Sequence, residues 1–405
     1  NGPEVSMQKD IRNLDGDEHR EWHNLYGMLF QRATAEGQIL RNPDQDIRPF
    51  VLSRAFFAGS QKYGAIWTGD NTALWSHLEV AAPMLLSLNV AALSFVGADA
   101  GGFFGNPDAE LFTRWMQAAA YTPFYRGHAH HDSKRKEPWM FDEDTLDRTR
   151  RATMARYALL PMWYTLFHEA ETTGMPVMRM MWMEYPKAES LYDVDHQYMI
   201  GSDLLVHPVT QQGGNEVEVL FPSKDLWYEA ESLALIASEE ANESAVMTKV
   251  YPADIDTIPV FQRGGSVISR KLRLRRSTLL MTSDPYSLFV ALDRESKAEG
   301  TLYMDDEETF GYKTHGKYAL AQFSVNLGGN KVTSISNTAV LGVGWSGDVV
   351  KDLADSRMVE RVVVAGLTKR PNAITLEGEI LNFEYDSEAS ILVVRKPSVS
   401  ALQNW

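Results

Sequence analysis

The chain has 405 residues, of which 44% are hydrophobic and 11% aromatic, and its net charge is −15 at pH 7. The aromatic content excludes a disordered polypeptide, and the negative charge argues against nucleic acid or an anionic membrane as partner. Cysteine is absent, which excludes disulfides and cysteine-based metal sites. No apolar run approaches the ~18 residues of a membrane-spanning helix, and the length predicts about two to four domains.

Residues 1–190 alternate short apolar runs with amphipathic stretches. A polar loop up to residue 16 precedes an amphipathic helix from Glu18 to about Gly37. The expected strands are 48–55, 65–70, 93–99 and 176–181, the expected helices are 77–90, 108–120 and 144–173, and 124–143 is expected to be a loop. Strands that alternate with helices predict a parallel β/α architecture.

After residue 190 the pattern changes to short strand-like runs separated by Gly, Pro, Asn and Asp. Closely spaced turns of this kind are typical of all-β modules. We therefore expect a fold that is α/β plus all-β, with a first domain at 1–190, a proximal β-sandwich at 191–280 and a distal β-sandwich at 281–405.

The four strands expected in the first domain are half of the number in a closed parallel barrel. An isolated half would expose an unpaired edge and an apolar face. We therefore expect residues 1–190 to be the C-terminal half of a (β/α)8 TIM barrel, whose first four strands come from an upstream segment.

Two carboxylates are candidates for catalysis. Asp70 and Asp99 each end a strand-like run, 29 residues apart, so both are expected at the same edge of a parallel sheet. Paired carboxylates suit acid/base chemistry on acetals, although the alternative is that each residue caps a loop or a helix. Arg54 ends the preceding strand, and it either orients Asp70 or a sugar hydroxyl or forms a structural ion pair.

A histidine-rich loop contains His128, His130, His131 and Asp132. The residue types fit a metal site, but a binuclear centre would need further ligands that the sequence does not supply. A hydrogen-bonding role in a surface loop is therefore favoured. Aromatic residues near the carboxylates suit sugar binding, although core packing would explain any one of them.

Taken together, the motifs resemble those of glycoside hydrolase family 31, the retaining α-glucosidases. They follow one another along nearly the whole chain, which makes the resemblance more specific than any single motif. The segments that carry it are 48–61 (RPFVLSRAFFAGSQ), 67–71 (WTGDN), 95–103 (FVGADAGGF), 124–128 (FYRGH), 157–161 (YALLP), 201–209 (GSDLLVHPV) and 259–265 (PVFQRGG). The family also has a barrel followed by two β modules.

The resemblance implies roles for three polar residues. Asp70 matches the general acid/base, which would have to be protonated in the resting enzyme. Arg54 and His128 match residues that hold the sugar in the cleaving subsite, with His128 acting through hydrogen bonds.

The resemblance also assigns the residues around that subsite. Asp99 matches a carboxylate near it, and Trp67 and Phe103 match its aromatic walls. The histidine-rich loop then contributes to sugar recognition, and neither a metal nor a cofactor is implied.

One motif of the family is missing. The family's nucleophile lies in a Trp-Asn/Asp-Asp-Met-Asn-Glu-Pro motif, which this chain does not contain. The resemblance puts that motif just upstream of residues 1–5 (NGPEV). It therefore implies an enzyme that is active only together with an upstream segment.

The resemblance finally implies a substrate, partners and a compartment. The expected activity is that of a retaining exo-α-glucosidase, which removes α1,3-linked glucose from high-mannose N-glycans in the endoplasmic reticulum lumen. The expected partners are the N-terminal fragment of the same α subunit, a regulatory lectin-like β subunit and the oligosaccharide substrate. The alternatives are an α-xylosidase or transglucosidase of the same family, a non-catalytic carbohydrate-binding fragment, and a metal-dependent barrel hydrolase.

Overall fold

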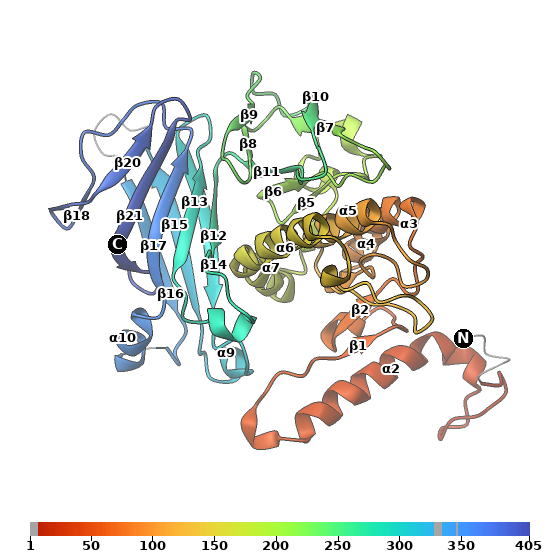
Figure 1. Ribbon diagram of the computed structural model, residues 1–405. Helices are drawn as coiled ribbons and strands as arrows, with labels where there is room; N and C mark the ends of the chain where they lie inside the picture. Colours follow the sequence, from red (N-terminus) through yellow and green to blue (C-terminus); the bar gives the residue numbers. More distant parts are fainter. Residues whose placement is uncertain (1–6, 328–333, 346) are drawn as a thin grey trace.

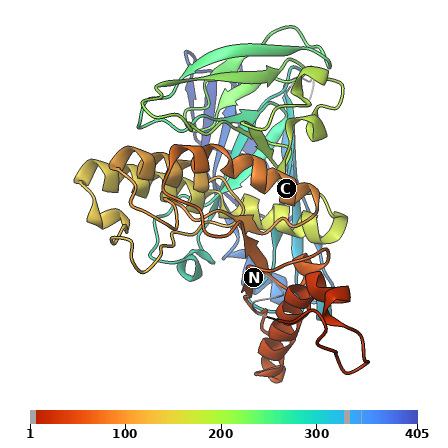
Figure 2. The same ribbon diagram turned by 90° about the vertical axis from the view of Figure 1, so that its right-hand side faces the viewer.

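The computed structural model describes residues 7–327, 334–345 and 347–405, so the first six residues of the predicted N-terminal loop lie outside it. Figure 1 shows a helical region with a short parallel sheet, a β-rich region above it, and a large sheet beside both. In the view of Figure 2, the helices lie between that β-rich region and the N-terminal helix. None of the described helices is long and apolar enough to cross a membrane.

The parallel sheet pairs three short strands in the order β1-β2-β3. They are β1 (Leu52–Ser53), β2 (Ala65–Trp67) and β3 (Val96–Gly97). The helices around them are α2 (His19–Leu40), α3 (Trp75–Glu79), α4 (Ala81–Val90), α5 (Ala109–Ala119), α6 (Glu143–Ala158) and α7 (Leu160–Thr173). The three strands and most of these helices fall where the sequence predicted them.

The helix predicted over 77–90 is divided at Val80 into α3 and α4. Pro83 lies in the first turn of α4, where the missing N–H of proline costs no helical hydrogen bond. In the same way, the helix predicted over 144–173 is divided at Leu159 into α6 and α7, with Pro161 in the first turn of α7.

The prediction of a fourth parallel strand at 176–181 is corrected by the structure. β4 (Met178–Arg179) instead pairs antiparallel with β5 (Tyr198–Ile200) in the neighbouring sheet. The segment beside β3 is 124–127, which was expected to be a loop: Phe124 N–H donates to Val96 O over 3.0 Å, and Ala100 forms a parallel bridge with Gly127. The segment is too short to contain the long apolar run by which strands are recognised in a sequence.

The β-rich region above the helices contains a six-stranded sheet in the order β4-β5-β6-β11-β8-β9. Its further strands are β6 (Leu204–Val206), β8 (Trp227–Glu229), β9 (Leu235–Ala237) and β11 (Val260–Arg263), and α8 (Met181–Glu184) follows β4. An antiparallel pair, β7 (Glu216–Pro222) and β10 (Val246–Pro252), shares a core with this sheet through Phe221 and Phe261. A second core joins β5 and β6 to α4 and α7, so this region is packed firmly on the helices.

The large sheet has eight strands in the order β16-β15-β14-β12-β13-β17-β21-β20. They are β12 (Ser266–Arg270), β13 (Tyr286–Ala291), β14 (Lys297–Met304), β15 (Ala319–Asn326), β16 (Ser334–Leu341), β17 (Met358–Ala365), β20 (Phe383–Asp386) and β21 (Ile391–Ser400). A small hairpin of β18 (Thr375–Leu376) and β19 (Glu379–Ile380) and the helices α9 (Gly311–Thr314) and α10 (Asp348–Ala354) complete this part.

The division of the β-rich part at residue 280 stays a prediction. β12 lies on the N-terminal side of that position, yet it pairs with β13 and β14 on the other side. The arrangement of these strands as two separate β-sandwiches likewise stays a prediction.

Candidate active site

The two candidate carboxylates lie at the same edge of the parallel sheet. Asp70 follows the carboxyl end of β2 after Gly69, which adopts a φ of +91° that favours glycine. Asp99 follows β3, the neighbouring parallel strand. In barrels of parallel strands, this edge is where catalytic groups are found.

Arg54 and Asp70 form an ion pair, and both residues line an open pocket of about 540 Å³. Arg54 Nη1 lies 3.5 Å from Asp70 Oδ2, and the two side chains are 64% and 28% exposed. Arg54 is thus more exposed than a buried strand-end arginine would be, and water screens its attraction to Asp70. Trp67 also lines the pocket, with the apolar side chains of Phe56 and Leu88.

Asp99 is buried, with 1% of its surface exposed, and it is held by Arg126. Arg126 donates to Asp99 Oδ1 from Nε over 3.0 Å and from Nη2 over 2.7 Å. Burial raises the pKa of Asp99, while the Arg126 guanidinium opposes that shift. The same guanidinium lies 4.9 Å from the centre of the Trp67 ring. Arg126 therefore contacts both Asp99 and Trp67, two residues that were predicted to belong to the site.

Asn71, next to Asp70, connects the loops that follow β2 and β3. Its side-chain amide donates to Asp99 O over 3.0 Å, and its Oδ1 accepts the Phe103 N–H over 2.8 Å. Its backbone carbonyl accepts N–H groups from Phe103 and Phe104. These hydrogen bonds hold Phe103, which was predicted to be an aromatic wall of the site, beside the turn that carries Asp70.

His128 stacks on Phe103, with ring centroids 5.3 Å apart and an angle of 26° between the planes. It follows the segment 124–127, which pairs with the chain around β3. The structure therefore brings His128, Phe103, Asp99 and Asp70 to one edge of the sheet. Their roles in catalysis and binding stay predictions.

The start of that segment is anchored by Arg156 on α6. Its guanidinium is buried without a carboxylate partner among the described residues, and it donates to the carbonyls of Ala120, Thr122 and Pro123. It also lies 4.4 Å from the centre of the Trp163 ring. Ala120 is the C-cap residue of α5, and the helix dipole favours a cation at this end.

Arg126, Asn71 and Arg156 are supporting residues that were not predicted from the sequence. Arg126 lies inside the segment 124–128, between aromatic residues and His128, and Asn71 ends the segment 67–71. The positions of Arg126 and Asn71 within these two motifs were the signals by which they could have been predicted. Arg156 lies within α6, where nothing in the sequence distinguishes it from its arginine neighbours.

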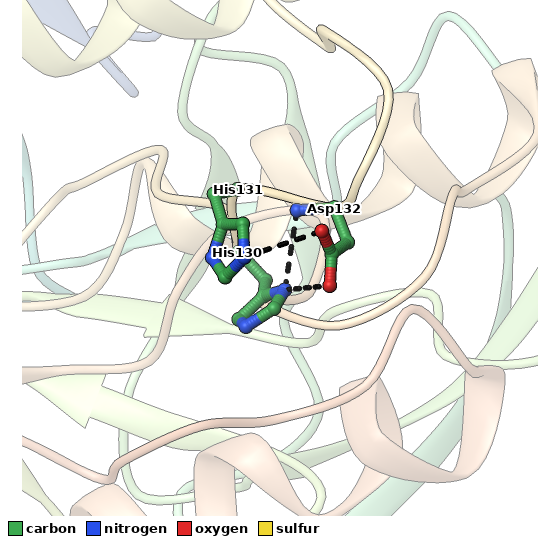
Figure 3. Close-up of side chains that lie close together, drawn as sticks. All are labelled: His130, His131 and Asp132. Carbon is green, nitrogen blue, oxygen red and sulfur yellow. Dashed lines mark hydrogen bonds and ion pairs between the residues drawn. The ribbon is translucent and has the colours of Figure 1, made fainter.

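Within the described part of the chain, His130, His131 and Asp132 have potential metal-ligand atoms within 4.8 Å of one another. Figure 3 shows the Asp132 carboxylate close to both imidazoles, with Oδ2 3.6 Å from His130 Nδ1 and Oδ1 3.2 Å from His131 Nε2. The Asp132 N–H also donates to His130 Nδ1 over 3.2 Å. Because that nitrogen already accepts a hydrogen bond, the arrangement favours hydrogen bonding over metal coordination.

Both the family models and known proteins match this chain. Residues 1–166 match the glycosyl hydrolases family 31 TIM-barrel domain, and residues 174–268 match the glycosyl hydrolase family 31 C-terminal domain. The neutral alpha-glucosidase AB of Dictyostelium discoideum is 49% identical over 98% of this chain, which covers 41% of that protein.

Solved structures agree with these matches. The crystal structure of a glucosidase II alpha subunit in its Glc1Man2-bound form gives a TM-score of 0.90 at 38% identity, over 100% of this chain and 44% of that one. A second solved structure is the catalytic subunit in an ER glucosidase II heterodimeric complex with the binding domain of the regulatory subunit. It gives a TM-score of 0.89 at the same identity and coverage. The chain thus spans less than half the length of these relatives. The motifs, the fold and the two family models together show that the chain belongs to glycoside hydrolase family 31.

Proposed function

We propose that this chain is the C-terminal part of a retaining exo-α-glucosidase that removes α1,3-linked glucose from high-mannose N-glycans. The observation that carries the proposal is the position of Asp70, at the carboxyl end of β2 beside Arg54 and an open pocket. The binding of Glc1Man2 by the related glucosidase II alpha subunit supports this substrate.

The proposed reaction is a double displacement. A carboxylate from the upstream segment attacks the anomeric carbon while Asp70 protonates the leaving oxygen, which gives a covalent glucosyl-enzyme. Asp70, now ionised, then takes a proton from the water that releases glucose. For this chemistry the two carboxyl groups should lie about 5–5.5 Å apart.

The remaining site residues would hold the glucose ring. Arg54 would orient the Asp70 carboxyl group and a sugar hydroxyl. His128 and Asp99 would form hydrogen bonds to hydroxyls, and Trp67 and Phe103 would cover the apolar faces of the ring. Arg126 would keep Asp99 in place.

We also propose that activity requires the upstream segment. Among the described residues, β1 has a neighbour on one side only, so one edge of the parallel sheet is open. Phe30 on α2 is 68% exposed and Phe50 before β1 is 59% exposed. A sheet edge and apolar side chains of this kind are normally covered, and the first four strands of the barrel would cover them.

The proposed setting is the endoplasmic reticulum lumen, with a regulatory lectin-like β subunit as partner. The related catalytic subunit that was solved with the binding domain of a regulatory subunit supports this partner.

The decisive experiment assays the chain alone and together with its upstream segment on an α1,3-linked glucosyl disaccharide. We expect hydrolysis only with the upstream segment, and NMR should detect α-glucose as the first product because a double displacement retains configuration. β-Glucose as the first product would refute the retaining mechanism. Preference for an α-xyloside, glucosyl transfer without hydrolysis, or binding without any turnover would each favour one of the alternatives.

A further inference from the structure

The loop that joins β9 to β10 contains the triplet Asn242-Glu243-Ser244. An asparagine that is followed two positions later by serine or threonine is the acceptor sequence for N-linked glycosylation, provided that proline does not lie between them. No other asparagine of the sequence is followed in this way. Such triplets also arise by chance, so the conformation and the surroundings of this one carry the argument.

The triplet forms a turn that is held by the side chain of Asn242. Its Oδ1 accepts hydrogen bonds from the backbone N–H and from the Oγ hydroxyl of Ser244, each over 3.0 Å. Among the described residues, the Nδ2 amide of Asn242 has no hydrogen-bond acceptor. Nδ2 is the atom to which a glycan is attached, so attachment would leave both hydrogen bonds of the turn intact.

The surroundings of the turn leave space for a bulky group. All three residues of the triplet are exposed, and the Glu243 carboxylate forms an ion pair with Lys187 rather than a contact with Asn242. Figure 1 shows β9 and β10 at the upper end of the molecule and the parallel strands β1 and β2 in its lower part. A glycan on this loop would therefore project into water and leave the candidate active site accessible.

We propose that Asn242 is a site of N-linked glycosylation. The donor is an oligosaccharide that is linked through its anomeric carbon to a lipid diphosphate. Nδ2 forms a bond to that carbon while the bond from the carbon to the diphosphate oxygen breaks, so the diphosphate leaves with the electron pair and Nδ2 loses one proton. The inference rests on the lumenal setting of the proposed function, because proteins acquire this modification in the secretory pathway.

The test examines the complete enzyme, in which the chain is joined to its upstream segment, isolated from its own cells. Trypsin cuts after Lys224 and Lys249, and Asn242 is the only asparagine of the resulting peptide 225–249. Peptide-N-glycosidase converts a glycosylated asparagine to aspartate, which takes up a heavy oxygen when the reaction is run in heavy-oxygen water. We expect mass spectrometry to detect this label at position 242. A parallel digest without the glycosidase should lack the label, which excludes spontaneous deamidation.

The chain supplies a matched internal control at Asn215. This residue is also exposed and is also followed by glutamate, but Val217 takes the place that serine has in the triplet. Asn215 is the only asparagine of the tryptic peptide 188–224. That peptide should therefore stay unlabelled in the same digest.

Variants expressed in the same cells test the acceptor sequence itself. Ser244→Ala removes the required hydroxyl and should lose the label, although Asn242 is still present. Ser244→Thr keeps a hydroxyl and should keep the label. Asn242→Gln should lose the glycan and change kcat/KM for the glucosyl disaccharide less than about twofold, because the loop lies away from the parallel sheet.

The outcomes separate this inference from the proposed function. An unlabelled peptide 225–249 in an enzyme that hydrolyses the disaccharide would overturn the glycosylation site and leave the proposed function intact. A labelled peptide in an enzyme that does not hydrolyse it would support the site and refute the proposed function, and the absence of both would refute both. A label that persists in Ser244→Ala would also overturn the inference, because the triplet would then not direct the modification.

Discussion

Arg126 directs two hydrogen-bond donors, Nε and Nη2, to the same oxygen of Asp99, over 3.0 and 2.7 Å. The other oxygen, Oδ2, is buried and has no hydrogen-bond partner among the described residues. One oxygen of this buried carboxylate thus accepts both hydrogen bonds from the guanidinium. The other oxygen can accept a hydrogen bond from another donor. A sugar hydroxyl in the proposed glucose site would provide such a donor.

Loss of Arg126 should be costly because it leaves Asp99 as an uncompensated buried charge. We expect Arg126→Ala to lower the free energy of unfolding by about 3–5 kcal/mol at neutral pH, measured by urea denaturation. Removing the guanidinium raises the pKa of Asp99 further, so the loss should shrink as the pH falls and the carboxyl group takes up a proton. Arg126→Lys keeps the charge and should cost less, and unchanged stability of Arg126→Ala would refute the argument.

Replacement of Asp70 should separate the two steps of the proposed reaction. Asp70→Asn cannot protonate a leaving sugar oxygen, so turnover of an ordinary glucoside should fall by about 10²–10⁴-fold or more. Fluoride leaves without a proton, so α-glucosyl fluoride should still glucosylate the complete enzyme, and mass spectrometry should detect the adduct. Wild-type turnover of the glucoside by this variant would contradict the assignment of Asp70.

Arg156 should stabilise the protein because it holds the chain just before the segment that carries Arg126 and His128. Arg156→Met keeps much of the side-chain volume but removes the three hydrogen bonds to the carbonyls of 120, 122 and 123. Hydrogen bonds from a charged group contribute about 1.5–3 kcal/mol each, so urea denaturation should show a loss of at least about 2 kcal/mol. Arg151→Met changes an exposed arginine of the same helix and serves as the control. Equal stability of the two variants would refute the anchoring role.

His207 gives the protein a predictable weakness at acidic pH. Burial, helped by the nearby His196, lowers the pKa of His207 from 6.5 to about 4. The unfolded chain therefore binds a proton that the folded chain does not, and stability falls as the pH decreases from 6.5 to about 4. This one group should account for a loss of about 3 kcal/mol, which denaturation of the wild type and His207→Asn at both pH values measures. An identical pH dependence of the two proteins would exclude His207 as the cause.

Chelation should leave the activity unchanged. The proposed reaction uses carboxylates for every proton transfer, and His130 Nδ1 already accepts the N–H of Asp132. Treatment of the complete enzyme with EDTA or phenanthroline should therefore not alter hydrolysis of the disaccharide. Activity that disappears with the chelator and returns with zinc would instead favour the metal-dependent alternative at the histidine-rich loop.

The sequence by itself determined the family and the order of the main elements. The motifs around Asp70, Asp99 and His128 are local strings, and each combines a short apolar run with turn residues and a polar side chain. A string of this kind predicts the end of a strand without knowledge of the tertiary structure, because the residues that favour a turn are neighbours in the sequence. The comparisons confirm membership of glycoside hydrolase family 31.

Only the tertiary structure decided which segment lies beside β3. The segment 124–127 takes that place, and β4, which lies in the apolar run 176–181, pairs with β5. Strands of two or three residues contain too few positions for a periodic pattern, so long-range packing selects their partners. The same reason explains Arg126: its bond to Asp99 joins positions 27 residues apart, and no local pattern encodes such a contact.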